Sequence, residues 1–316
     1  MAFHLRTCRT ALAAALTTVL LAPIPATAAD AGRRQGGELC TAGRDRAFAA
    51  RMSRDIRAAL SSRRGTVSIA VHDTRTGLVC NLASRRRYDA ASVVKVLMME
   101  AALRRAQEWG RGLTAWERRR IRPMITVSDN TATTWLWRNL GQPRLSRFLR
   151  HVGTTSTTLG PYGFWGLTRT TAADQMKLLG VLTGARGDLR ASSRAYGLRQ
   201  MAEVRRDQRW GVPAGMPRGV RAHLKNGWLP RARFGWRVHS VGVFTGAGRT
   251  YRIVVLSHGN PSMSYGVRTI ERIAQAVHRG LNKGRALGQG FTPESEISEV
   301  PDGSAPAEGE GGKPAA

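Results

Sequence analysis

Segments with the period-two pattern of β-strands stand at both ends of this chain, with helical patterns between them. Residues 66–71 alternate in polarity, 74–77 form a turn signal, and 78–82 follow as a return strand. Strand patterns come back only at 221–226, 235–245 and 250–257. Because strands must pair, this order predicts an α/β (α+β) fold with one antiparallel sheet built from N- and C-terminal strands.

Helical periodicity marks the remaining segments. Residues 45–60 carry apolar side chains at helical spacing, and a mostly apolar, buried helix begins at Ala91. We expect further helices near residues 114–125, 131–139, 143–151, 171–183, 191–203 and 262–281. The central helices form a predicted helical subdomain, and a cleft between it and the sheet is the predicted site.

Both ends of the chain differ in composition from its centre. Arg6 and Arg9 precede an apolar run at 11–21, and a small-residue cleavage site ends at Ala28. Residues 1–28 are therefore predicted to be a secretory signal peptide, with an uncleaved signal anchor as the alternative. We expect a folded domain over 29–288, a disordered acidic tail rich in Pro, Gly and Ser over 289–316, and a secreted, extracytoplasmic protein without a stable membrane anchor.

Removal of the signal peptide leaves two cysteines, Cys40 and Cys80, in an oxidising compartment. A disulfide between them would close a loop of about 40 residues and stabilise the fold by about 4 kcal/mol in the chain-entropy account. Two separate buried thiols are the alternative. No Cys-x-x-Cys pair, His-Glu-x-x-His helix or calcium loop occurs, so we expect no metal and no other cofactor.

The formal net charge of +29 raises the question of a nucleic-acid partner. The arginines are scattered through the chain in short clusters, and no nucleic-acid motif accompanies them, so we expect no such partner. The same positive field favours attraction to anionic cell-wall polymers or membrane surfaces. We expect a monomer.

Lysine is rare in this basic chain, and two of its five lysines lie in short motifs. Ser-Val-Val-Lys spans Ser92–Lys95, Ser-Asp-Asn spans Ser128–Asn130, and Lys-Asn-Gly spans Lys225–Gly227. Arginine stays protonated, whereas a buried lysine can lose its proton and act as a base. A serine and a lysine three residues apart at a helix start share one face, which suits a nucleophile and its base.

Each motif also has a structural interpretation, as a helix start, a cap with a turn, and a polar strand end. Together, and in this order, they resemble the penicillin-recognising serine hydrolases, most closely the class A β-lactamases, over roughly residues 45–281. The resemblance implies that Ser92 is the acylated nucleophile and Lys95 its general base. It implies that Ser128 relays a proton and that Asn130 contacts a substrate amide.

The strand motif completes the implied site. The resemblance assigns Lys225, with Asn226 and Gly227, to substrate binding, and makes Lys225 the partner of a substrate carboxylate. The backbone N–H groups of Ser92 and Trp228 would form the oxyanion hole.

The segment between Ser92 and Ser128 is shorter than the family usually has, and the chain departs from the family pattern at two further places. Asn226 stands where the family has Thr or Ser, and residues 160–167 contain no acid where class A enzymes carry the glutamate that activates the deacylating water. The nearest acid is Asp174, which a helix cap explains. We therefore expect acylation with slow hydrolysis, since general base catalysis contributes about 100- to 10,000-fold. His223 and His239 are alternative bases, although structural roles are favoured.

Three functions remain open. The leading hypothesis is an exported serine hydrolase acting on small-molecule β-lactams or related acyl-D-alanine-like amides. The second is a D-alanyl-D-alanine carboxypeptidase or transpeptidase acting on a peptidoglycan peptide. The third is a catalytically weak cell-wall binding or regulatory protein.

Overall fold

The computed structural model describes residues 38–184, 187–246, 248–286, 304 and 305, and these belong to one compact unit. The predicted signal peptide at 1–28 lies outside the described residues. So do both expected domain boundaries and all of the predicted tail except Ser304 and Ala305.

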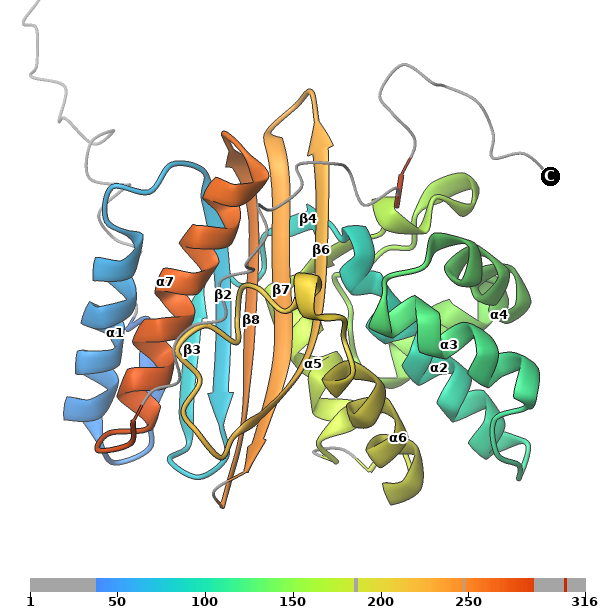
Figure 1. Cartoon of the computed structure of the whole chain (residues 1–316), viewed down its shortest axis with the longest axis horizontal. Helices are drawn as coiled ribbons and strands as arrows, with labels where there is room; N and C mark the ends of the chain where they lie inside the picture. The colour runs from blue at the N-terminus through green and yellow to red at the C-terminus, as the bar shows by residue number, and fades with distance from the viewer. Residues whose placement is uncertain (1–37, 185–186, 247, 287–303, 306–316) are drawn as a thin grey trace, which may run out of the picture. The chain divides into compact units, whose positions relative to one another are not determined.

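A six-stranded antiparallel sheet runs through the centre of this unit in the order β1-β3-β2-β8-β7-β6 (Figure 1). Its strands are β1 (Cys40–Ala42), β2 (Thr66–Asp73), β3 (Leu78–Leu82), β6 (Arg221–Arg231), β7 (Gly235–Gly246) and β8 (Arg249–Asn260). β2 pairs with β8 along its whole length, from Thr66 opposite His258 to Asp73 opposite Tyr251. N- and C-terminal strands therefore share one sheet, which confirms the predicted fold class.

Three short strands escaped the sequence analysis. They are β1 and the antiparallel pair of β4 (Arg87–Asp89) and β5 (Arg169–Thr171). Each is three residues long, which is too short to show an alternating pattern. A disulfide joins Cys40 of β1 to Cys80 of β3, which lie directly opposite each other with their Cα atoms 4.0 Å apart.

The helices begin and end within a few residues of their expected positions. They are α1 (Arg46–Leu60), α2 (Val94–Glu108), α3 (Ala115–Thr126), α4 (Asn130–His151), α5 (Ala172–Leu182), α6 (Ala191–Ala202) and α7 (Met263–Leu281), with 3-10 turns η1 (Ala91–Val93), η2 (Pro161–Gly163), η3 (Trp165–Leu167) and η4 (Arg206–Gln208). Gly141, with φ of 72°, interrupts α4 between the two helices predicted there. Within the described ranges, no helix is long and apolar enough to cross a membrane.

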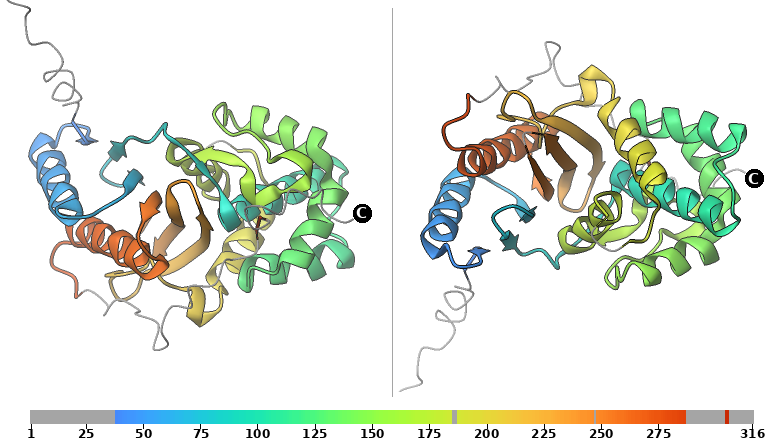
Figure 2. Two further views of the ribbon diagram at one scale, coloured as in Figure 1. Left: turned by 90° about the horizontal axis from the view of Figure 1, so that it is seen from above. Right: turned by 90° about the horizontal axis from the view of Figure 1, so that it is seen from below.

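The helices form two layers around the sheet (Figures 1 and 2). α1 packs on α7, and α7 packs on β7 and β8. α5 packs on β2 and β8 and contacts α2, which lies among the helices α3 to α6. Twelve of the fifteen residues of α2 are buried, because the helix is surrounded by neighbours. The serine motif therefore opens the central helix of the helical subdomain.

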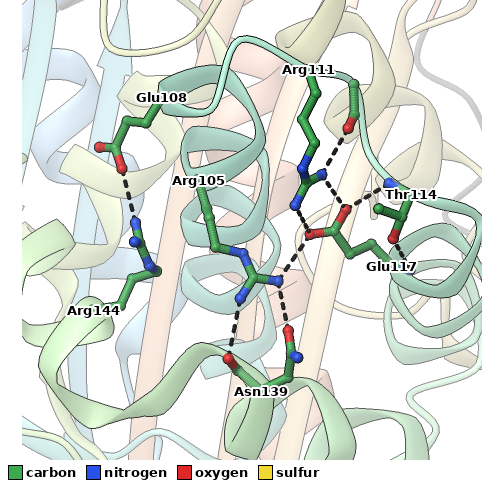
Figure 3. A network of polar contacts seen from close by, with 8 residues as sticks. Arg105, Glu108, Arg111, Thr114, Glu117, Asn139 and Arg144 are labelled. Carbon is green, nitrogen blue, oxygen red and sulfur yellow. Dashed lines mark hydrogen bonds and ion pairs between the residues drawn. The ribbon is translucent and has the colours of Figure 1, made fainter.

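A buried carboxylate ties three of these helices together (Figure 3). Glu117, whose side chain is 2% exposed, accepts hydrogen bonds from Arg105 at 2.9 Å and from Arg111 at 2.8 and 3.0 Å. It also accepts the Thr114 backbone N–H at 2.6 Å, as part of the capping box of α3. Arg105 also donates to the backbone carbonyl and to the Oδ1 atom of Asn139 in α4. Burial raises the pKa of Glu117, but the bonds from Arg111, Thr114 and Arg105 outweigh it and lower this pKa to about 2.

Glu117→Gln is expected to lower the free energy of unfolding at neutral pH by about 3 kcal/mol, the equivalent of a pKa lowered from 4.5 to about 2. The unfolded carboxyl titrates at the higher pKa. The loss of unfolding free energy in the variant is therefore largest above about pH 5.5. It shrinks as the pH falls through the pKa of the unfolded carboxyl, 4.5, and disappears near the pKa of the folded carboxyl, about 2. Urea unfolding at pH 7 and at pH 3.5 measures both values.

Glu108→Gln is the matched control, since Glu108 also binds two arginines, Arg104 and Arg144, but is 38% exposed. Glu108→Gln is expected to lower the free energy of unfolding by less than about 1 kcal/mol. If Glu117→Gln lowers the free energy of unfolding by an equally small amount, or by an amount that does not change with pH, the Glu117 carboxylate does not stabilise the fold in the way described.

Candidate active site

The serine of the first motif lies in a strained turn that leads into α2. Ser92 belongs to η1, and Lys95 follows in the first turn of α2, so both residues lie on one continuous helical path. Both side chains are fully buried. Ala91 has φ of 45°, in the left-handed region that a non-glycine residue enters at a cost of about 1–3 kcal/mol. The fold thus holds the residue next to Ser92 in an unfavourable conformation.

The hydroxyl of Ser128 lies between the two motif lysines. Lys95 Nζ donates to Ser128 Oγ at 2.9 Å, to the Ser128 carbonyl at 2.7 Å and to Asn130 Oδ1 at 2.8 Å. Lys225 Nζ donates to the same Ser128 Oγ at 3.0 Å and to the Asn226 carbonyl at 2.8 Å. One oxygen therefore connects two buried amines that are 130 residues apart in the chain. The structure brings all three motifs together.

The short segment that carries Ser128 is itself held in place. Ser128 has φ of 59°, a second left-handed residue at the site. Asp129 is the N-cap of α4, and its carboxylate accepts the Ala132 N–H at 2.6 Å. The cap interpretation of this motif is thus correct for Asp129, while its neighbours Ser128 and Asn130 contact Lys95.

The edge of β6 passes directly against the serine turn. A Cβ atom on Gly227 would lie 2.7 Å from the Ser92 nitrogen and 2.9 Å from the Val93 nitrogen, distances that real Cβ atoms do not show. Only glycine allows this approach. It places Trp228, the next residue of the strand, beside the backbone of Ser92, and the Trp228 ring packs edge-on against Trp210 at 5.7 Å.

The side chain of Asn226 is fully buried and is used inside the protein. Its Nδ2 donates to the carbonyls of Gln208 at 2.8 Å and Trp210 at 2.9 Å, which joins β6 to the end of η4 and to the segment after it. Both amide hydrogens therefore have acceptors. The expected hydrogen bond to a substrate carboxylate would require one of these two bonds to break.

An aromatic ring faces Lys95 in the segment where the resemblance led us to look for an acid. The ring of Trp165 lies 4.7 Å from Lys95 Nζ, and its Nε1 donates to Thr134 Oγ1 of α4 at 3.2 Å. Trp165 is 4% exposed. Asp174, the nearest acid in sequence, accepts from the Ser156 N–H at 2.9 Å and from Thr157 Oγ1 at 2.8 Å. It holds the loop that follows α4.

The two candidate histidine bases have structural bonds at both ring nitrogens. His239 Nε2 bonds the Asp89 carbonyl at 2.8 Å, and its Nδ1 accepts the Ser257 N–H at 3.2 Å. His239 is fully buried, and burial lowers its pKa to about 4. His223 bonds the Leu198 carbonyl and Thr245 Oγ1, and burial lowers its pKa as well. The favoured structural interpretation fits both residues.

A cavity of about 500 Å³ adjoins this site. It reaches Asn130, and five of its twelve lining residues are aromatic: Trp135, Trp137, Tyr162, Phe164 and Trp165. Ser304 and Ala305 also line it, and the Ser304 carbonyl accepts the Gly166 N–H at 3.0 Å. An aromatic surface of this kind suits an apolar or ring-bearing part of a substrate.

Sequence reasoning did not find Ala91, Thr134 or Trp165 as members of the site. A left-handed alanine has no sequence signature, because its neighbours impose its conformation. The tryptophan belonged to a segment whose only notable property was that it lacked an acid.

Together these residues define a class of protein. A serine at a helix start, a lysine one turn later, a second serine bonded to two amines and a strand edge beside the nucleophile's N–H are the components of an active-site serine hydrolase. The sequence model of the Beta-lactamase enzyme family matches residues 51–115 and 117–281, so the chain belongs to this family and is a serine hydrolase. A search of curated proteins found no match.

Solved structures share the fold. The last common ancestor of Gram-negative bacteria class A beta-lactamase is 22% identical, covering 74% of this chain and 100% of its own, with a TM-score of 0.63. A beta lactamase from Xanthomonas campestris is 19% identical, covering 74% of this chain and 98% of its own, also with a TM-score of 0.63. The architecture is thus that of class A β-lactamases.

Gly227→Ala is expected to reduce the rate of Ser92 acylation by about tenfold or more, because the added methyl must push β6 away from the backbone of Ser92. Gly112→Ala is the matched control, since its nearest neighbour would be a side-chain atom of Arg118 at 3.9 Å. The rate of covalent labelling by a fluorescent penicillin reports both. Equal labelling rates in the two variants would contradict the close packing of β6 on η1.

Proposed function

We propose that this enzyme forms an acyl-enzyme on Ser92 with β-lactams or related acyl-D-alanine-like amides. The observation that carries the proposal is the Ser128 hydroxyl bonded to both Lys95 and Lys225. A bridge of this kind can deliver a proton to a leaving nitrogen and recover it from an amine. Class A β-lactamases, whose fold this chain shares, support β-lactams as the substrate class.

The proposed reaction requires Lys95 to lose a proton, and because a neutral amine has two N–H donors, one of its three donated bonds to Ser128 and Asn130 is then released. Repulsion between two nearby cations favours the loss of one proton, and Lys225 shares an acceptor with Lys95. Lys95 takes the proton of Ser92 Oγ, which attacks the carbonyl carbon. The N–H groups of Ser92 and Trp228 stabilise the oxyanion. The C–N bond breaks as Ser128 donates its proton to the nitrogen, and Ser128 regains a proton from Lys95.

The second half-reaction lacks an assigned base. The ring of Trp165, which faces Lys95, cannot accept a proton from water, and Asp174, His223 and His239 are engaged in structural bonds. We therefore propose that the acyl-enzyme accumulates and hydrolyses slowly. Its hydrolysis is expected to be about 100- to 10,000-fold slower than at a site with a positioned base.

Recognition of a substrate carboxylate is also proposed to be weak. Lys225 is fully buried and donates to protein oxygens, and the amide hydrogens of Asn226 bond the carbonyls of Gln208 and Trp210. The aromatic cavity beside Asn130 offers apolar contact instead. We expect binding to depend more on the acyl side chain of the substrate than on its carboxylate.

A D-alanyl-D-alanine carboxypeptidase or transpeptidase is the second candidate. The tryptophan at Lys95 favours it, because an acyl-enzyme protected from water survives long enough to transfer its acyl group to an amine. Release of D-alanine from a muropeptide, with little turnover of a chromogenic cephalosporin, would support this candidate over a β-lactamase.

We propose that the enzyme is exported. The composition of residues 1–28 and the disulfide between Cys40 and Cys80 support this, since disulfides persist in oxidising compartments. The intact mass of the protein isolated from its source tests the proposal, because export predicts that residues 1–28 are missing.

Incubation with a penicillin is expected to add one equivalent of the compound to the intact mass, on Ser92, and the adduct should persist after excess compound is removed. Ser92→Ala should show no adduct. Time-resolved intact-mass spectrometry with peptide mapping measures both. If several β-lactams leave the mass of the folded wild-type protein unchanged, the proposed acylation is wrong, and a binding or regulatory protein becomes the better explanation.

Trp165→Glu is expected to accelerate loss of the adduct by tenfold or more, because it introduces a carboxylate beside Lys95 that can activate water. Trp165→Phe keeps a ring without a base and should leave the rate within about threefold of wild type. The decay of the adduct mass after removal of free compound gives each rate. Equal decay in both variants, with acylation retained, would show that the missing acid does not limit hydrolysis.

A further inference from the structure

A second cavity, of about 450 Å³, lies away from the active site, where the ends of several elements meet. The start of α1, the turn between β2 and β3, the start of β8 and the residues that follow α7 surround it; in Figure 1 these ends gather at the lower left. Its lining is Asp45, Phe48, Arg51, Arg75, Thr76, Arg249, Gly280, Leu281, Asn282, Lys283 and Arg285. None of these residues belongs to the catalytic constellation.

The lining is far more cationic than the chain as a whole. Five of its eleven residues are arginine or lysine, compared with 50 of 316 in the full sequence. The cavity beside the active site provides a comparison within the same molecule, because Arg138 is the one cationic residue among its twelve lining residues. A generally basic composition therefore does not account for the charge of the second cavity.

Little negative charge in the described residues offsets this concentration. The carboxylate of Asp45, the one acid in the lining, caps α1 by accepting the Phe48 N–H at 2.8 Å. Arg249 pairs with the buried Asp73 at 3.2 Å and donates to the Leu281 carbonyl, so it ties β8 to the end of α7. The second cavity thus has one anchored guanidinium in a rigid position.

The other four cationic side chains of the lining form no ion pair with a described residue. These are Arg51, Arg75, Lys283 and Arg285. The Nε of Arg51 is buried and has no hydrogen-bond partner in the described part of the chain. A buried donor without an acceptor is unfavourable, and like charges around one cavity repel. An anion with several oxygen acceptors would relieve both effects.

We propose that this second cavity binds a phosphate group. Guanidinium groups present parallel N–H donors that match phosphate oxygens, and four of the five cations here are arginines. The volume exceeds that of one phosphate, so the group can belong to a soluble phosphate or to the headgroup of an anionic lipid.

The test compares two double variants of equal charge. Arg51→Gln with Arg285→Gln removes two cations from the cavity, whereas Arg54→Gln with Arg57→Gln removes two exposed cations of α1 that do not line it. Calorimetric titration with orthophosphate and with tripolyphosphate, at constant ionic strength, measures soluble ligands. Flotation with phosphatidylglycerol–phosphatidylcholine vesicles measures the headgroup. Labelling of Ser92 by penicillin serves as the folding control.

The cavity variant is expected to bind at least about tenfold more weakly than wild type, and the α1 variant to match wild type within about threefold. If the cavity variant alone loses binding of tripolyphosphate or orthophosphate, the ligand is a soluble phosphate. If it alone loses binding to vesicles, the ligand is a lipid headgroup. Equal effects of the two double variants, or no binding of any of these ligands by the wild-type enzyme, would overturn the proposal. Because acylation is measured separately, failure here leaves the proposed function intact.

Discussion

The burial of two lysines around one serine hydroxyl is the constraint on which the rest of this structure depends. A buried ammonium loses several kcal/mol of hydration unless oxygen acceptors replace the water. Lys95 and Lys225 find those acceptors in Ser128, Asn130 and Asn226, which come from different elements. The helical subdomain and the sheet must therefore meet with little freedom. The Glu117 network among α2, α3 and α4 and the close passage of β6 past η1 provide that rigidity.

The same constraint separates the two halves of the chemistry. In the proposed reaction, the proton passes to the leaving nitrogen through Ser128, which both Lys95 and Lys225 contact. The ring of Trp165 lies 4.7 Å from Lys95 Nζ, in the segment where the family resemblance implies an acid. Under the proposed function, this arrangement favours the formation of an acyl-enzyme over its hydrolysis. The chain belongs to the Beta-lactamase enzyme family and shares the fold of class A β-lactamases, and its own structure places Trp165 against Lys95.

Much of the fold followed from local patterns, because burial imposes a period of two on strands and of 3.6 on helices. That N- and C-terminal strands share one sheet followed from the placement of strand patterns at both ends of the chain, whereas the pairing of β2 with β8 is seen only in the structure. Patterns of three residues carry no period, so β1, β4 and β5 were missed. At the site, the three motifs located Ser92, Lys95, Ser128 and Lys225. The motifs could not predict which way the Asn226 amide points, because its direction depends on the backbone carbonyls of Gln208 and Trp210.

The sequence by itself determined which chemical groups are present: a serine and lysine one turn apart, a second serine, a strand lysine followed by a glycine, and no acid between residues 160 and 167. Only the tertiary structure decided that one hydroxyl bonds both lysines and that a tryptophan ring lies against Lys95. It also showed that five cations from four separate segments surround a second cavity. These are contacts between residues distant in the chain, and no local pattern encodes them because packing of the whole fold sets their distances.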